Sequence, residues 1–130
     1  MKSTKKGIVR ILNAFKYSYD GFIATFKSEE AFRQDVLVFI ILTPIAIFLP
    51  ITILEKTVLI MSLFIIIIAE LINTAIEMTI DRISDDFHKL SKIAKDIGSC
   101  VVLISFINLF AVWLPILYSN RNIIFSLFNN

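Results

Sequence analysis

Four polar side chains repeat at helical spacing near the middle of this 130-residue chain. They are Glu70, Asn73, Glu77 and Asp81, separated by three, four and four residues. On an α-helix they share a face about 80° wide. They follow the 13 uncharged residues 57–69, so the first of them lies at or just inside a membrane boundary. A carboxylate there is costly unless it is paired, protonated or bound to a cation, and this face is therefore expected to have a function.

The residue types on this face suit phosphate chemistry. Carboxylates without His or Cys beside them favour Mg²⁺, which takes one or two protein carboxylates and shares substrate phosphates. Glu77, with Glu29 or Asp81, could supply those ligands. Glu70 lies one turn or more deeper and is placed to act as a general base. The structural alternative is a hydrogen-bonded seam that joins helices.

A second charged group follows this face. It contains Asp85, Asp86, His88, Lys92, Lys95 and Asp96. Lys95 could neutralise a phosphate that Asp96 orients, and the small residues Gly98 and Ser99 allow a close backbone approach. The three glycines stand apart, so side chains must hold any nucleotide. Taken singly, these residues are typical of a solvated loop.

Composition places this chemistry in a membrane. Apolar residues make up 57% of the chain and charged residues 18%, and the mean hydropathy is +0.81. A soluble domain has about 45–50% apolar and about 25% charged residues. The single cysteine excludes an intrachain disulfide framework. We therefore expect an all-α integral membrane protein with one domain, 1–130, and three transmembrane helices at about 30–50, 55–84 and 93–119.

Basic residues orient these spans. Seven precede the first span and four follow the second: Lys2, Lys5, Lys6, Arg10, Lys16, Lys27 and Arg33, then Arg82, Lys89, Lys92 and Lys95. Only Lys56 and Arg121 fall on the opposite side. The positive-inside bias therefore predicts a cytoplasmic N-terminus and a cytoplasmic second loop. The net charge of +2 is too small to indicate a nucleic-acid partner.

The segment 7–27 has the pattern of an amphipathic surface helix. Its apolar residues recur at intervals of three and four: Ile8, Ile11, Leu12, Phe15, Tyr19, Phe22, Ile23 and Phe26. They form a stripe about 120° wide, suited to the cytoplasmic interface of a membrane. Ser28 is placed to cap a new helix, with Glu29 and Glu30 in its first turn.

Several motifs together resemble the small membrane-integral diacylglycerol kinases of bacteria, from about Gly7 to Trp113. They are Arg10 with Ala14 and Tyr17-Ser18; Glu29-x-Ala31-Phe32-Arg33-Gln34; Glu70-x-x-Asn73-x-Ala75-Ile76-Glu77; Asp81-Arg82-Ile83; His88-x-Leu90-Ser91; and Ala94-Lys95-Asp96-x-Gly98-Ser99. The resemblance implies transfer of the γ-phosphate of ATP to diacylglycerol, giving phosphatidic acid. It also implies a homotrimeric bundle in the bacterial cytoplasmic membrane, with active sites shared between subunits.

The resemblance assigns roles to individual residues. It makes Glu70 the general base, places Asn73 and Lys95 beside it in catalysis, and gives Mg²⁺ to Glu29 and Glu77. The implied ATP contacts are Arg10, Tyr17, Glu29, Glu77, Asp86, Phe87, His88, Lys95 and Asp96. The implied lipid contacts are Arg10, Ala14, Ser18, Ala31, Phe32, Arg33, Gln34, Asp35, Glu70, Ser99 and Trp113.

The sequence leaves alternatives open for the metal ligand, the lipid and the class of function. Glu30 stands beside Glu29 where the family pattern has a small residue, so either could be the metal ligand. The related undecaprenol kinases use a different lipid in a similar fold. A small ion or proton carrier, in which Glu70 and Glu77 line a polar path, would leave Arg10, Lys95, Asp96 and Glu29 unexplained. A non-catalytic scaffold whose acids only join subunits is a further alternative.

Overall fold

The computed structural model describes residues 7–128, which contain five helices and no strand. The helices are α1 (Ile8–Ser28), α2 (Glu30–Phe48), α3 (Ile53–Ile83), α4 (Lys89–Ser119) and α5 (Arg121–Ser126). The expected all-helical class is confirmed, and α1 closely matches the predicted segment 7–27. Lys2, Lys5 and Lys6, which contribute to the charge bias, lie outside the described residues.

Three of the helices, α2, α3 and α4, are long and apolar enough to cross a membrane. With 19 residues, α2 is about 28 Å long, close to the bilayer core of about 30 Å. Helices α3 and α4 have 31 residues each, or about 46 Å. Each of these two must therefore extend beyond the hydrocarbon region.

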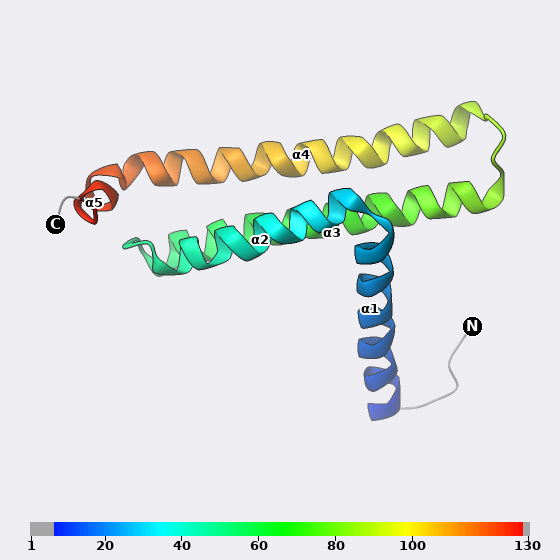
Figure 1. Ribbon diagram of the computed structural model, residues 1–130, viewed down its shortest axis with the longest axis horizontal. Coiled ribbons are helices and arrows are strands. Elements are labelled where there is room, and N and C mark those ends of the chain that lie inside the picture. Colours follow the sequence, from blue (N-terminus) through cyan, green and yellow to red (C-terminus); the bar gives the residue numbers. More distant parts are fainter. Residues whose placement is uncertain (1–6, 129–130) are drawn as a thin grey trace.

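The long helices run beside one another in alternating directions (Figure 1). Helix α3 packs against α4 over most of its length and against α2 on another side. Helix α1 turns away from this bundle at the corner where α2 begins, and α3 and α4 continue past that corner (Figure 1). The corner therefore divides α3 into a part packed against α2 and a projecting end.

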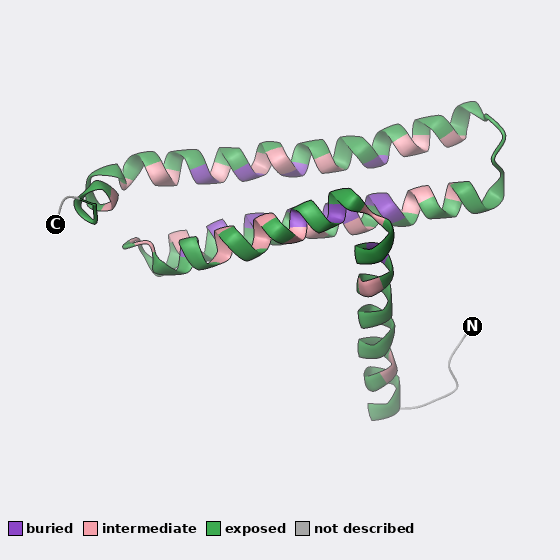
Figure 2. Ribbon diagram, viewed as in Figure 1, coloured by how far each residue is buried: buried purple, intermediate pink, exposed green. Residues whose placement is uncertain are grey.

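Burial is concentrated on α3 and on the faces turned toward it (Figure 2). The core contains Ala46, Leu59, Leu63, Ile66, Leu109 and Trp113. The indole Nε1 of Trp113 donates a hydrogen bond to Ser62 Oγ across α3 and α4, at 3.1 Å. Outward faces remain apolar, with Phe48 83% and Leu103 60% exposed, as expected for helices whose solvent is lipid.

The end of the bundle opposite the α1–α2 corner is closed by polar contacts. Thr52 and Glu55 form a capping box at the start of α3. The other Glu55 oxygen accepts a hydrogen bond from Asn120 Nδ2 at 2.8 Å, and Lys56 Nζ donates to the Ile47 carbonyl at 2.7 Å. These contacts tie the α2–α3 turn to the end of α4. Helix α2 ends at Phe48, two residues before Pro50, which favours early termination.

One local prediction is wrong. Ser28 does not cap α2, because it ends α1 and its Oγ donates back to the Thr25 carbonyl; Glu29 is the residue at the N-cap. Helix α4 begins at Lys89, four residues before the expected span of about 93–119, and His88 Nδ1 caps it by accepting the Leu90 N–H at 3.2 Å. The segment between α3 and α4 therefore contains only residues 84–88.

Candidate active site

An acidic cluster forms where α1, α2 and α3 meet. Glu70 lies on α3 and is only 5% exposed. The carboxylates of Asp35, Glu77 and Glu29 are near enough for their charges to act on Glu70. Asp35 is a buried residue of α2, and Glu29 belongs to the corner between α1 and α2. Side chains from three separate elements thus converge on one buried carboxylate.

The corner that carries Glu29 is held by backbone and side-chain contacts. Glu29 is extended, with φ −108° and ψ 121°, and its N–H donates to the Thr25 carbonyl at 2.9 Å. The Arg33 guanidinium donates to the carbonyls of Phe26 and Lys27 at the end of α1. The buried Phe32 ring packs edge-on against Phe22, with centroids 5.1 Å apart. Arg33 and Phe32, predicted to contact lipid, thus fix the position of Glu29.

Glu29 and Glu30, which are adjacent in sequence, have different environments at this corner. Glu29 is partly buried and its charge acts on Glu70. Glu30 is exposed in the first turn of α2, where the helix dipole stabilises it. This geometry favours Glu29 over Glu30 as a ligand near Glu70.

Asn73 links the cluster to Glu77. Its Nδ2 donates to Glu77 Oε1 at 3.3 Å, one turn along α3. Asn73 is 8% exposed, and its Oδ1 is buried without a hydrogen-bond partner among the described residues. The amide therefore orients Glu77 from the side that faces Glu70.

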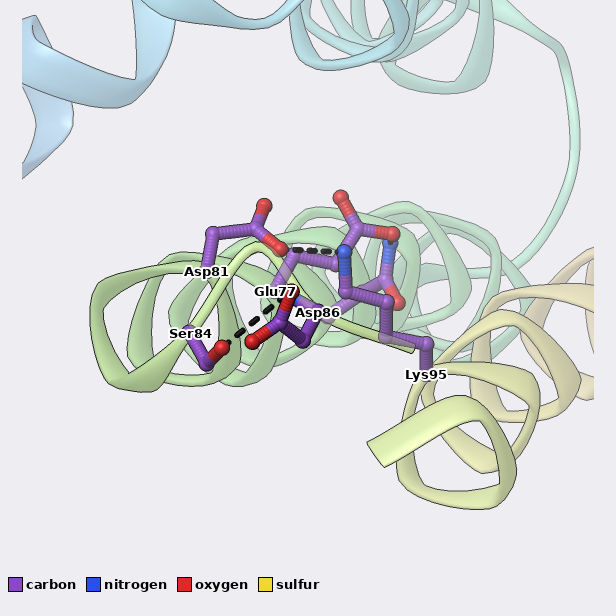
Figure 3. Close-up of polar contacts among 6 residues, drawn as sticks. Glu77, Asp81, Ser84, Asp86 and Lys95 are labelled. Carbon is purple, nitrogen blue, oxygen red and sulfur yellow. Dashed lines mark hydrogen bonds and ion pairs between the residues drawn. The ribbon is translucent and has the colours of Figure 1, made fainter. Parts of the chain in front are cut away.

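Beyond the corner, the projecting ends of α3 and α4 are joined by charge. Lys95 Nζ of α4 reaches Asp81 Oδ1 of α3 at 2.5 Å (Figure 3). Lys92 pairs with Asp96 within α4 at 2.6 Å. In the connecting segment, the Asp86 N–H donates to Ser84 Oγ at 2.9 Å (Figure 3). Of these contacts, the Lys95–Asp81 ion pair joins the two helix ends, and a hollow lies between them.

This hollow is a cavity of about 480 Å³ between the helix ends. Five of the nine predicted ATP contacts line it: Asp86, Phe87, His88, Lys95 and Asp96. Asp81, Ser84 and Ser91 line it too, although they were not predicted as ATP contacts. The spacing of Asp81 and Lys95 around a short turn is the sequence signal that could have found Asp81.

Other predicted site residues lie elsewhere. Arg10, Ala14, Tyr17 and Ser18 are exposed on α1, which leads away from the bundle (Figure 1). Ala31, Gln34 and Ser99 are exposed on α2 and α4 near the cluster end of those helices. Trp113 is buried in the core near the other end of α4. One chain therefore brings together the acids and the loop residues, but not the α1 residues.

The donor set suits one divalent cation only in part. Among residues 7–128, no group of three or more His, Cys, Asp or Glu side chains is arranged to hold a metal ion. Three carboxylates, those of Asp35, Glu77 and Glu29, lie within electrostatic range of Glu70, and the resemblance assigns the metal to Glu77 and Glu29. Mg²⁺ usually takes one or two protein carboxylates and completes its shell with water and phosphate oxygens. The site thus fits Mg²⁺ that arrives with a nucleotide better than a resident metal.

Comparison with known proteins identifies the family of this chain. The family model for prokaryotic diacylglycerol kinase matches residues 16–117. A diacylglycerol kinase of Pseudomonas aeruginosa is 43% identical over 111 residues, covering 85% of this chain and 90% of that protein. Those of Escherichia coli K12 and Haemophilus influenzae are 37% and 38% identical, covering 92% and 86% of this chain and 98% and 95% of those proteins. The chain belongs to the prokaryotic diacylglycerol kinase family.

Proposed function

We propose that this chain carries out its family's reaction at the cluster and cavity described above. Family membership makes it an ATP-dependent kinase that phosphorylates diacylglycerol. The observation that carries the assignment of the site is the order of groups along α3. Glu70 is buried at the corner, Glu77 follows after seven residues, and Asp81 with Lys95 borders the cavity.

This order matches the parts of the two substrates. Glu77 and Asp81 lie about 10 Å and about 16 Å along the helix from Glu70. A lipid hydroxyl at Glu70, a γ-phosphate near Glu77 and a nucleoside in the cavity would then lie in sequence. Phosphoryl transfer depends on such positioning and on charge compensation more than on covalent chemistry.

Glu70 is proposed as the base that accepts the proton of the lipid hydroxyl. Its carboxylate is nearly enclosed, so few water molecules compete for that proton. Oxygen attack on the γ-phosphorus forms the new O–P bond as the bond to the β-phosphate oxygen breaks. Lys95 compensates phosphate charge by leaving Asp81, with which it forms a half-exposed ion pair.

Mg²⁺ is proposed to enter with ATP. Glu29 and Glu77 would hold it, and it would neutralise charge on the phosphate oxygens. Asn73 keeps Glu77 oriented through its amide hydrogen bond. Asp86, Phe87, His88 and Asp96 would contact the nucleotide in the cavity.

The lipid is proposed to reach Glu70 from the membrane surface at the α1–α2 corner. Helix α1 would lie in the cytoplasmic interface with its Phe-rich face in the acyl region. The exposed residues Ala31, Gln34 and Ser99 would border the lipid, and Asp35 would face its headgroup. A diacylglycerol could then keep its chains in hydrocarbon while its hydroxyl meets ATP from the cytosol.

A homotrimer with shared sites is part of the proposal. Arg10 and Tyr17 lie on α1, which points away from the bundle that holds the cavity (Figure 1). They would therefore contact the nucleotide bound by a neighbouring subunit. A groove of about 400 Å³ along α3 and α4 contains Asn108, whose Nδ2 is buried without a partner among the described residues. Asn108 lies within the uncharged run 97–120, and the hydrocarbon around such a run contains no hydrogen-bond acceptor. In the proposed trimer, a neighbouring subunit would supply the acceptor for Asn108 Nδ2.

Lipid labelling tests the reaction and the lipid. Purified protein in mixed micelles with Mg²⁺ and γ-labelled ATP is given either diacylglycerol or undecaprenol. Preferential labelling of diacylglycerol is expected. Preferential labelling of undecaprenol would reverse the choice of lipid, and no labelled lipid from either would refute the kinase assignment.

A further inference from the structure

Gly98 lies where α4 packs against Asn73 of α3 at the site. It is a buried residue of α4. A Cβ added to it would collide with Asn73 Oδ1 and lie 3.4 Å from Asn73 Cγ. It would lie 3.6 Å from Asn73 Cα, an ordinary contact distance. The conflict is thus with the end of the Asn73 side chain and not with the α3 backbone.

No hydrogen bond from another described residue holds Asn73 Oδ1 in place. The Nδ2 of Asn73 donates to Glu77. The side chain is enclosed between α3 and α4, so the α4 backbone at Gly98 limits how its amide can turn. A side chain at position 98 would occupy the space that the oxygen now fills.

We propose that Gly98 is a positioning residue for the nucleotide site. It lets α4 close on Asn73, which fixes the amide in the orientation that donates to Glu77. Glu77 is thereby oriented before Mg²⁺ and ATP arrive. This inference rests on the proposed role of Glu77, and Gly98 itself touches neither substrate.

The proposal predicts that Gly98→Ala changes the kinetic constants for ATP while the protein keeps its fold. In Gly98→Ala the Asn73 side chain must rotate, because its end moves more easily than either helix. The Glu77 carboxylate then loses the hydrogen bond that Asn73 Nδ2 donates to it. The KM for ATP at fixed Mg²⁺, and the Mg²⁺ concentration for half-maximal rate, should each rise about ten-fold, with kcat changed less.

Gly21→Ala is the matched control. Gly21 also lies inside a helix, and a Cβ there meets nothing within 4 Å. Alanine improves helix propensity at both positions, so the intrinsic backbone effect is shared. Gly21→Ala should keep the wild-type KM and Mg²⁺ dependence, and a rise equal to that of Gly98→Ala would overturn the proposal.

A double-mutant cycle with Asn73→Ala separates positioning from general damage to the fold. Shortening residue 73 removes the collision, so adding Gly98→Ala in that background should leave KM unchanged. If Gly98→Ala alone fails to fold, the double variant should fold again. An unchanged KM in Gly98→Ala, or an effect that persists without Asn73, would overturn the proposal. Those failures leave wild-type lipid labelling intact, whereas failure of the proposed function abolishes it.

Discussion

Lys95 forms an ion pair between two helices and is also the residue proposed to compensate phosphate charge. Its ammonium pairs with Asp81, and the two side chains are 38% and 61% exposed. An exposed pair of this kind contributes only about 0–1 kcal/mol to stability. A triphosphate can therefore take the ammonium from Asp81 at little cost. Under the proposed function, the ion pair would hold the lysine at the edge of the cavity until a nucleotide binds.

Replacing Lys95 tests this exchange. Lys95→Met keeps most of the aliphatic stem but removes the charge, and it should lower kcat/KM for ATP at least ten-fold, or about 1.4 kcal/mol. Lys92→Met is the comparison, because Lys92 pairs with Asp96 within α4 and borders the same cavity. Its effect should be under about three-fold. Equal losses in steady-state kinetics would remove the special role of Lys95.

The sequence alone does not show whether Glu29 or Glu30 is the metal ligand, because two adjacent acids fit the same motif. The choice depends on the corner, where the extended Glu29 turns inward and Glu30 enters α2. Asp81 was predicted as a possible metal ligand and not as a cavity residue, because its partner Lys95 comes from another helix; only the short turn between the two helices could have indicated the pair. Residue types and their spacing on one helix could be predicted from the sequence, whereas contacts between side chains of different helices could not.

The same substitution at these two positions gives a matched pair. Glu29→Gln should raise the Mg²⁺ concentration for half-maximal activity about ten-fold, because one of two proposed carboxylate ligands is lost. Glu30→Gln should change it by less than about two-fold, since Glu30 is exposed. The reverse order of effects in a Mg²⁺ titration would assign the ligand to Glu30.

At the scale of elements, the apolar runs predicted the helices well and their ends less well. Uncharged length locates a span, because hydrocarbon excludes charge. Helix ends depend on local hydrogen bonds: His88 caps α4, which begins before the expected span, and Ser28 closes α1 rather than opening α2. The α3–α4 pair also depends on the Trp113–Ser62 hydrogen bond, which no periodicity reveals.

That hydrogen bond should contribute measurably to helix pairing. Trp113→Phe keeps a ring but loses the donor, and it should reduce the free energy of unfolding by about 1 kcal/mol. Helical circular dichroism during denaturant titration measures the loss in detergent. Ser62→Ala should give a similar loss, and the double variant should lose less than the sum. Additive losses would show that the two side chains stabilise the protein independently.

At the scale of the whole molecule, α1 separates predicted site residues that the sequence groups together. Arg10 and Tyr17 lie on a helix that leads away from the bundle, while Lys95 lies at the cavity (Figure 1). Sequence motifs cannot say which chain supplies each residue of a site. The proposed ring of subunits, in which each subunit lends α1 to its neighbour, would reconcile the motifs with the fold.

Mixing two inactive variants tests this arrangement. In co-refolded Arg10→Ala and Lys95→Met subunits at equal amounts, about a quarter of the sites in a cyclic trimer join an intact Arg10 to an intact Lys95. Lipid labelling should recover to about that fraction of wild type, while each variant alone stays low. Mixtures no more active than the separate variants would place Arg10 and Lys95 in the same subunit's site.

The central claim is that the buried carboxylate of Glu70 takes the proton of the lipid hydroxyl. Its most direct test compares Glu70→Gln with wild type for turnover of diacylglycerol and for ATP binding. Turnover should fall by about 10²- to 10⁴-fold, the range for loss of a general base, while ATP binding stays within about two-fold. Near-normal turnover in Glu70→Gln would contradict the account.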